Sequence, residues 1–267
     1  MEVKVFDSVT EASREALELF QSALNDGAKA FGLATGSTPE KLYELMRGSS
    51  IDFSQATSIN LDEYYGLASD HPQSYNYYMH KQLFDAKPFA KNYLPDGTNE
   101  NPQEERDRYN QIIADNPIDL QLLGIGENGH VGFNEPGSSF DSHTRLVDLT
   151  DSTIQANKRF FDSEADVPKQ AYSMGLADIM SADQVILMAF GAKKAWAVNQ
   201  MVNGPVTEDV PASILQKHDN VVVIEKIPRK FSNNNIYSRN PRKISDLNWH
   251  LFKNKISPTQ IFDKWDH

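Results

Sequence analysis

Six short apolar runs recur along the first 224 residues of the chain. In several of them the apolar side chains occupy successive positions and do not alternate with polar ones, which is typical of strands that are covered on both faces. The runs are VKVF (3–6), AFGLAT (30–35), SINL (58–61), DLQLLGI (119–125), QVILMAF (184–190) and NVVVI (220–224). The pattern therefore predicts a sheet whose strands are mostly parallel.

Helical patterns separate these runs. Residues 8–24 open with Ser8 and Glu11 at the spacing of a capping box, and a second helical pattern covers residues 39–46. One face of the first segment is apolar at Ala12, Ala16, Leu19, Phe20 and Ala23. Strands that alternate with helices predict an α/β fold with a doubly wound, mostly parallel sheet and helices on both faces. No internal repeat or linker-like stretch divides residues 1–224, which we expect to form a single domain.

Composition and charge narrow the class of partner. The net charge of −11 argues against an extended nucleic-acid backbone, although a small phosphorylated molecule needs only a few local cations. The chain has no cysteine, which excludes disulfides and thiolate metal sites, and we expect a cytoplasmic protein. The N-terminal residues MEVKVFDSVTEASREAL contain no apolar signal-peptide core, and no run is long enough to span a bilayer, so we expect no membrane partner.

Residues 225–267 differ from the rest of the chain. They hold nine Lys or Arg against four Asp or Glu, and the stretch KFSNNNIYSRNPRK within them is polar and rich in asparagine. Such a composition predicts no regular structure. We expect a basic C-terminal tail that is loosely ordered or docked, rather than a binding segment.

The stretch AFGLATGSTPEKLYELM suggests an anion site. A buried strand ends before Gly36, Ser37 and Thr38, and we expect a helix with Thr38 as N-cap and Pro39 as its first residue. Free N–H groups and the positive end of the helix would then face the carboxyl edge of the sheet, where α/β proteins bind ligands. The stretch is neither a Walker loop nor a dinucleotide fingerprint. The alternative is a well-capped turn without a ligand.

Two adjacent carboxylates follow the run SINL. Because neighbouring side chains on an extended chain point in opposite directions, only one of Asp62 and Glu63 is expected to face a cleft. Shielding by Tyr64 and Tyr65 can raise the pKa of such a carboxyl and make it a base. The alternative is a solvated acidic turn.

The stretch GIGENGHVGFNEPGSS (124–139) follows the apolar run DLQLL and carries a histidine in a glycine-rich bend. Histidine is the side chain best matched to proton transfer near neutral pH. Glu135 is placed to hold the far nitrogen of the His130 ring, and the alternative is a satisfied loop histidine beside a turn acid. His130 and His143 lack a familiar ligand spacing, so no metal site is predicted.

Local cations are present despite the negative net charge. Lys193 and Lys194 follow the run QVILMAF, and Arg159 lies in ANKRFF. Arginine can bind a phosphate through two hydrogen bonds, although each of these residues alone reads as a solvated charge. Strand ends that offer anion donors, a carboxylate and a histidine together indicate a small anionic substrate that undergoes proton transfer.

At these residues the chain resembles the glucosamine-6-phosphate deaminase family of sugar-phosphate isomerases that release ammonia. The matching stretches are LATGSTP, NLDEYYGL, HPQSYNYYMHKQLF, GIGENGHVGFNEPGSSF, TRLVDLT, ANKRFF and GAKKAWAV. The resemblance covers most of residues 1–224 and implies a Rossmann-like sheet with one active site at the strand ends. It also implies a mobile lid at about residues 149–170.

The resemblance assigns roles residue by residue. Asp62 matches the base that moves a proton between C2 and C1 of the sugar through an enolamine. His130 matches the residue that opens the ring, Glu135 its supporting carboxylate, and Asn128 a weaker partner of the same imidazole. The phosphate contacts match Gly36, Ser37, Thr38, Arg159 and Lys194. The implied products are fructose 6-phosphate and ammonia, and the implied reaction requires no cofactor.

Two positions depart from the pattern of many members. Those members have Asp where this chain has Asn128, and an amide can orient His130 but cannot stabilise an imidazolium by charge, so Glu135 takes more of that role. Allosterically activated hexameric members carry a basic residue where this chain has Val147. We therefore expect no activation by N-acetylglucosamine 6-phosphate, and a monomer or a small homo-oligomer.

Two other functions remain open at this stage. A 6-phosphogluconolactonase shares the implied fold and phosphate site but needs a histidine beside a water molecule, not a carboxylate over C2, so the motif LDEY argues against it. A non-catalytic sugar-phosphate sensor is expected to have lost Asp62 or His130, and both are present. Such a sensor is also expected to carry a DNA-binding helical segment, and none is recognised beside the sheet.

Overall fold

The computed structural model describes residues 1–158, 161, 163 and 166–226. One compact unit contains all of them. A seven-stranded sheet forms the centre, and its strand order is β1-β10-β9-β6-β2-β3-β5. All six strand pairings in this sheet are parallel. The predicted fold class is therefore confirmed. The strands are β1 (Glu2–Val5), β2 (Ala30–Leu33), β3 (Thr57–Asn60), β5 (Lys91–Tyr93), β6 (Leu120–Gly124), β9 (Gln184–Phe190) and β10 (Val221–Lys226).

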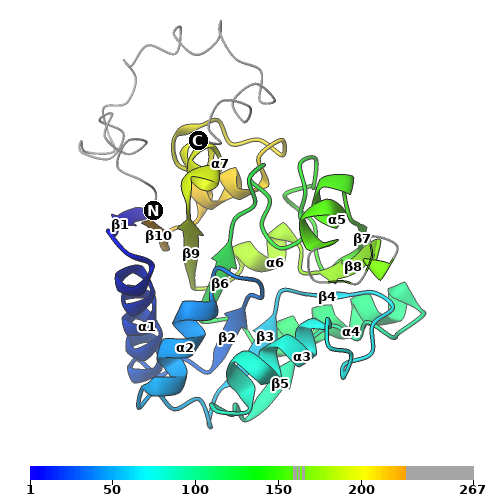
Figure 1. Ribbon diagram of the computed structural model, residues 1–267, viewed down its shortest axis with the longest axis horizontal. Helices are drawn as coiled ribbons and strands as arrows, with labels where there is room; N and C mark the ends of the chain where they lie inside the picture. Colours follow the sequence, from blue (N-terminus) through cyan, green and yellow to red (C-terminus); the bar gives the residue numbers. More distant parts are fainter. Residues whose placement is uncertain (159–160, 162, 164–165, 227–267) are drawn as a thin grey trace, which may run out of the picture. The chain divides into compact units, whose positions relative to one another are not determined.

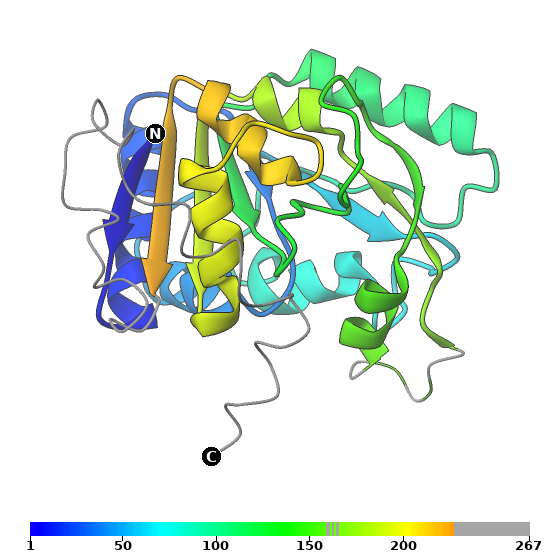
Figure 2. The same ribbon diagram turned by 90° about the horizontal axis from the view of Figure 1, so that it is seen from above.

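Helices cover both faces of this sheet (Figures 1 and 2). Right-handed crossovers place α1, α2, α3 and the π-helix η1 on one face, and α4, α6, α7 and the 3-10 helix η5 on the other. Their bounds are α1 (Val9–Asn25), α2 (Glu40–Gly48), α3 (Tyr75–Met79), η1 (His80–Phe84), α4 (Pro102–Asp115), α6 (Leu176–Met180), α7 (Ala195–Asn203) and η5 (Pro211–Lys217). Of the helices described, none has the length and apolar character that crossing a membrane requires.

The chain reverses its direction across the sheet between β2 and β6. From β2 it builds outward through β3 to β5, and α4 then returns it to β6, from which it builds toward the other edge. The connections that leave β2 and β6 therefore run to opposite faces and part at the carboxyl ends of these two neighbouring strands. This is the topological switch point at which open α/β sheets bind ligands.

A second, smaller sheet lies beyond the end of β3. It consists of β4 (Asp62–Tyr64), β8 (Gln170–Ser173) and β7 (Arg145–Asp148), paired antiparallel in the order β4-β8-β7. Leu61 joins the two sheets, because its N–H donates to the carbonyl oxygen of Leu33 at 3.0 Å and its own carbonyl oxygen accepts from the N–H of Met174 at 2.7 Å. The segment α5 (Asp151–Asn157) follows β7, and the 3-10 helix η4 (Ala192–Lys194) follows β9.

The structure corrects two boundaries that the sequence predicts. The strand predicted at SINL (58–61) is β3, which runs from Thr57 to Asn60, and after Leu61 the chain enters the second sheet. Thr38 is not the N-cap of α2: the cap is Pro39, whose carbonyl oxygen accepts from the N–H of Tyr43 at 2.9 Å, and the helix begins at Glu40. The predicted cap at Ser8 is confirmed, because its hydroxyl oxygen accepts from the N–H of Glu11 at 3.1 Å.

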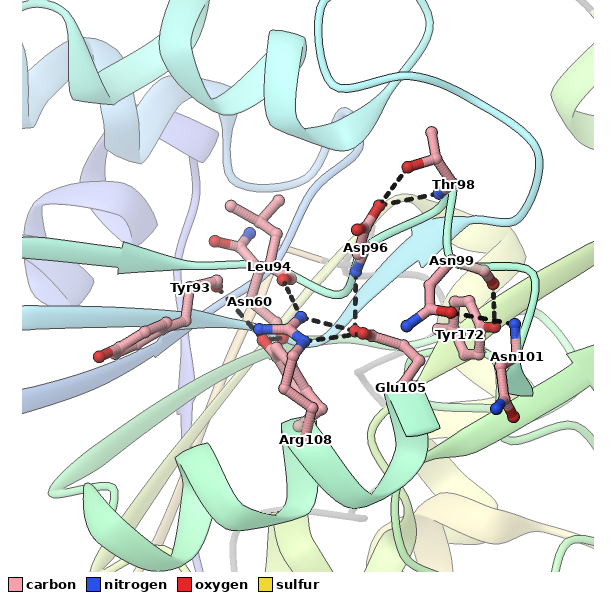
Figure 3. A network of polar contacts seen from close by, with 11 residues as sticks. Asn60, Tyr93, Leu94, Asp96, Thr98, Asn99, Asn101, Glu105, Arg108 and Tyr172 are labelled. Carbon is pink, nitrogen blue, oxygen red and sulfur yellow. Dashed lines mark hydrogen bonds and ion pairs between the residues drawn. The ribbon is translucent and has the colours of Figure 1, made fainter. Parts of the chain in front are cut away.

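Helix α4 braces the strand ends near Asp62 (Figure 3). The hydroxyl group of Tyr109, which is fully buried, lies 2.6 Å from the carbonyl oxygen of Asn60 and 3.2 Å from that of Tyr93. Arg108 holds the buried carboxylate of Glu105 through two nitrogens, at 2.7 and 2.6 Å. The last residue of β3 is thereby fixed two positions before Asp62.

Removal of the Tyr109 hydroxyl is expected to destabilise the fold. In Tyr109→Phe the carbonyl oxygens of Asn60 and Tyr93 lose a buried donor, and we expect the free energy of unfolding to fall by about 2 kcal/mol. Urea denaturation followed by circular dichroism measures the change. Tyr77→Phe, at a tyrosine that is 42% exposed, is the matched control and should leave the midpoint unchanged. Equal stability of the two variants would show that this hydroxyl is not a brace.

Candidate active site

The turn after β2 presents backbone N–H groups at the switch point. The hydroxyl of Tyr43 donates to the carbonyl oxygen of Ala34, and that of Tyr78 donates to the carbonyl oxygen of Gly36 at 2.6 Å. Gly36 has a φ of +90°, a conformation that glycine adopts without strain. Within the described residues, the N–H groups of residues 36–38 donate to no protein acceptor. Two carbonyls of the turn are thus held by tyrosine hydroxyls, and its N–H donors are available for an anion.

Asp62 and Glu63 point in opposite directions, as the alternation along a strand predicts. Asp62 is 7% exposed and faces the loop after β6: a Cβ placed at Gly132 would lie 3.6 Å from its Oδ2. Glu63 accepts three backbone hydrogen bonds, from the N–H groups of Tyr64 at 2.8 Å, Tyr75 at 2.9 Å and Asn76 at 2.9 Å. Glu63 therefore ties β4 to the start of α3, and Asp62 is the carboxylate that faces the switch point.

The surroundings of Asp62 favour its protonated form in the ligand-free protein. Burial raises the pKa of Asp62 to about 8, and the neighbouring charge of Glu63 adds to the shift. Burial also raises the pKa of Glu63 to about 7, although its three N–H donors act in the opposite direction. Asp62 thus has the raised pKa expected of a shielded base.

A cluster of aromatic rings provides this shielding. Tyr64 packs against Tyr75, with ring centroids 4.7 Å apart, and against Phe133 at 6.0 Å. Phe161 meets the same Tyr64 ring edge-on at 5.9 Å. Tyr65, which the sequence also offered as a shield, packs instead against Tyr172 on the side of Glu63. The cluster therefore connects the strand of Asp62, the loop of His130 and the segment that contains α5.

The loop after β6 holds His130 in one orientation. A Cβ at Gly126 would lie 2.2 Å from Cε1 of the imidazole, so only glycine permits the ring to lie against the backbone there. Nδ1 of His130 is 2.7 Å from Oδ1 of Asn128, and Nδ2 of Asn128 donates to Oε2 of Glu135 at 2.7 Å. Because a carbonyl oxygen only accepts, Nδ1 must carry the proton. Nε2 of the neutral ring is therefore available as a base.

Glu135 is ionised in this arrangement. Burial alone would raise its pKa, but the imidazole of His130, 3.4 Å away, and the donors Thr153 and Asn128 lower the pKa of Glu135 to about 2. Oε1 of Glu135 accepts from the hydroxyl of Thr153, and the Thr150 hydroxyl lies 3.3 Å from the same oxygen. The carboxylate thus connects the histidine loop to α5.

Two predicted phosphate contacts come from other parts of the chain. Lys194 ends the short helix η4, directly after β9 and Gly191, whose φ is +93°. Arg159 lies outside the described residues. No group of three or more His, Asp or Glu side chains in the described ranges is arranged to hold a metal ion.

Sequence reasoning missed the contributions of Thr153, Ser173 and Gly132. The hydroxyl oxygen of Ser173 accepts from the N–H of Phe133 at 3.1 Å and would lie 3.2 Å from a Cβ at Gly132, so Ser173 sets the path of the histidine loop. These residues carry no local signal, since Thr153 reads as an ordinary helix residue and Ser173 as the end of a short strand.

The fold and this site define a class of α/β proteins in which N–H donors, a buried carboxylate and an oriented imidazole meet at one edge of a parallel sheet. The chain belongs to the family of glucosamine-6-phosphate isomerases and 6-phosphogluconolactonases, whose model matches residues 5–224.

Individual relatives agree with this assignment. A protein of Lacticaseibacillus paracasei named glucosamine-6-phosphate deaminase is 58% identical over 224 residues, which cover 84% of this chain and 95% of that protein. One of Streptococcus pyogenes with the same name is 57% identical over 222 residues, which cover 83% and 94%. The structure of a monomeric glucosamine-6-phosphate deaminase is 38% identical, with a TM-score of 0.82 over 87% of this chain and 99% of that chain. The 6-phosphogluconolactonase of Trypanosoma brucei, 18% identical with a TM-score of 0.72 over 87% of this chain and 98% of that chain, shares the fold.

The contact between Gly126 and His130 yields a paired test. In Gly126→Ala the new methyl group occupies the place of the imidazole, and we expect kcat on glucosamine 6-phosphate, the compound in the relatives' name, to fall about 100-fold with the fold retained. In Gly124→Ala, at a glycine of the same strand end with no atom within 4 Å of the new Cβ, kcat should stay at the parent level. A steady-state assay measures both, and equal activity of the two variants would contradict the placement of His130.

Proposed function

We propose that this chain is a glucosamine-6-phosphate deaminase, which converts D-glucosamine 6-phosphate and water into D-fructose 6-phosphate and ammonia without a cofactor. The observation that carries the proposal is the placement of the buried Asp62 beside the loop of the oriented His130 at the switch point. Relatives that are 55–58% identical to this chain are named for this activity, and the match covers 95% of the length of two of them. We further propose that residues 1–224 contain the complete active site. The predicted tail, 225–267, begins within β10, which ends at Lys226, and the rest of it lies outside the described residues.

In the proposed mechanism, the phosphate binds to the N–H groups and hydroxyls of Gly36, Ser37 and Thr38, with Arg159 and Lys194 as cationic partners. The N–H groups of this turn supply hydrogen bonds, and the N-terminus of α2, which begins at Glu40 directly after the turn, supplies a partial positive charge. The bound phosphate fixes one end of the sugar, so that C1 and C2 extend toward the carboxylate and the imidazole.

His130 then opens the sugar ring. Its unprotonated Nε2 takes the proton of the C1 hydroxyl, the bond between C1 and the ring oxygen breaks, and the proton passes to that oxygen to give the open-chain aldehyde. The proton on Nδ1 remains bound to Asn128, and Glu135 stabilises the transient imidazolium by charge.

Asp62 performs the isomerisation. As a carboxylate it takes the proton from C2, and the electron pair moves toward the aldehyde oxygen on C1. That oxygen takes a proton from the ammonium group of the substrate, which gives a neutral enolamine with a hydroxyl on C1. Asp62 returns its proton to C1, which leaves the protonated imine of the ketose. Water adds to the imine carbon, its protons pass to the nitrogen, and the nitrogen leaves as ammonia with the remaining proton, giving fructose 6-phosphate. The ammonium group of the incoming substrate is a nearby positive charge that lowers the pKa of Asp62 and so favours the required carboxylate.

Three further properties belong to this proposal. A cytoplasmic site of action is supported by the absence of cysteine, and the net charge of −11 favours a small-molecule substrate over a nucleic acid. A monomer or small homo-oligomer is supported by the likeness to a monomeric deaminase. Val147 packs against the aromatic cluster, so an apolar side chain there has a structural role, and we propose no allosteric activator site at this position.

The direct test is the release of products by the purified protein without added metal or cofactor. We expect ammonia and fructose 6-phosphate in equal amounts from glucosamine 6-phosphate. The same preparation should not hydrolyse 6-phosphogluconolactone, the substrate of the rival activity. Binding of glucosamine 6-phosphate without release of either product would favour a sensor instead.

The buried charge of Asp62 predicts opposite effects on activity and stability. Asp62→Asn should abolish turnover while it still binds the substrate, because the base is lost and the phosphate contacts remain. In the folded protein the pKa of the Asp62 carboxyl is about 8, whereas in the unfolded chain the same group ionises at about pH 4. Between these pH values only the unfolded chain is ionised at this position, so the free energy of unfolding falls as the pH rises from about 4 to 8. We therefore expect Asp62→Asn to be more stable than the parent by roughly 2 kcal/mol or more at pH 8.5, and to show no such advantage near pH 4.

Thermal melts at the two pH values and a turnover assay measure these effects. Asp52→Asn, at an exposed aspartate, is the control for a change of net charge. A variant Asp62→Asn with parental turnover would remove Asp62 as the base, and equal stability at pH 8.5 would show that its carboxyl is not held in its neutral form.

A further inference from the structure

The two carboxylate oxygens of Glu135 have separate partners. Oε2 accepts from Nδ2 of Asn128 and lies 3.4 Å from Nδ1 of His130. Oε1 accepts from the hydroxyl of Thr153, and the hydroxyl of Thr150 lies 3.3 Å from it. Thr153 belongs to α5 and Thr150 is its N-cap. One oxygen is thus held by α5, and the other orients the histidine loop.

A carboxylate that is anchored at one oxygen has a fixed direction at the other. The terminal torsion of a glutamate is broad, so the side chain alone does not select an orientation. Glu135 and Thr153 are both only 8% exposed, and water is therefore a poor substitute for the threonine donor. The hydroxyl of Thr153 consequently determines where Oε2 meets the amide of Asn128, and the amide in turn determines which nitrogen of His130 carries the proton.

On the basis of the proposed function, we propose that Thr153 is a positioning residue for proton transfer by His130. Thr153 acts through Glu135 and Asn128. The tautomer of His130 with an unprotonated Nε2 therefore depends on the position of α5, which carries Thr153.

The first test reads the tautomer directly in the ligand-free full chain. Nitrogen-15 NMR spectra of the histidine rings are recorded at a pH at which the rings are neutral. The signals of His130 are identified as those missing from the variant His130→Gln. We expect the parent to carry its proton on Nδ1 alone, and Thr153→Val, which keeps the shape but loses the donor, to show a mixture of both tautomers. Thr153→Ser keeps a hydroxyl and should restore the parental spectrum.

A matched control separates this effect from damage to the helix. Gln155→Val places the same β-branched residue on the exposed side of α5 and should leave the spectrum unchanged. A parental spectrum in Thr153→Val would overturn the proposal, and so would a mixture of tautomers in Gln155→Val, since the effect would then come from the helix rather than the hydroxyl.

Kinetics supply a second readout. Loss of one hydrogen bond to a charged group is expected to lower kcat about tenfold in Thr153→Val, with KM changed less than twofold, and Thr153→Ser should recover most of kcat. A rise in KM with unchanged kcat would contradict positioning of the base. The spectra require no turnover, so an inactive parent would refute the proposed function while the spectra still decide the role of Thr153.

Discussion

The geometry of the site depends on Leu61, which hydrogen-bonds with both sheets. Its N–H group still pairs with the end of β2, while its carbonyl oxygen already pairs with the residue that follows β8. The next residue, Asp62, is consequently held at the junction of the two sheets, where burial and the charge of Glu63 raise the pKa of its carboxyl.

Burial of the Asp62 carboxyl group costs free energy, and contacts among the surrounding residues offset this cost. The aromatic cluster around Tyr64, Tyr75 and Phe133 gains apolar contact, and Glu63 caps α3 through backbone donors. Both features stabilise the environment of Asp62 without neutralising it. The fold therefore tolerates a buried carboxyl at this position because the residues around it are well packed.

The central sheet could be predicted from the sequence because β2, β6, β9 and β10 carry apolar side chains mostly at successive positions, which is typical of buried parallel strands. The second sheet could not, since β4 has the sequence Asp-Glu-Tyr and β7 the sequence Arg-Leu-Val-Asp, and neither shows an apolar period.

The same contrast holds for the site. Alternation along an extended strand was enough to separate the directions of Asp62 and Glu63, and the glycine-rich loop identified His130. The link from Thr153 to Glu135 joins residues 18 positions apart across a tertiary contact, so no local pattern reports it. The sequence predicts Thr38 as the N-cap because hydroxyl residues favour that position, but in the structure Pro39 is the cap and α2 begins one residue later than predicted, at Glu40.

The chain of contacts from Thr153 to His130 also explains why an amide suits position 128 in this protein. Asn128 accepts from His130 with its oxygen and donates to Glu135 with its nitrogen, and only an amide can do both at 2.7 Å. A carboxylate at the same place would set two negative oxygens against each other, and one of them would have to bind a proton or move away. The low pKa of Glu135 depends in part on the hydrogen bond from the Asn128 amide. The negative charge of Glu135 therefore stabilises the imidazole of His130, and the amide of Asn128 orients that imidazole. Asn128 therefore acts together with Glu135: the position of the Glu135 carboxylate orients the Asn128 amide, and the amide selects the tautomer of His130.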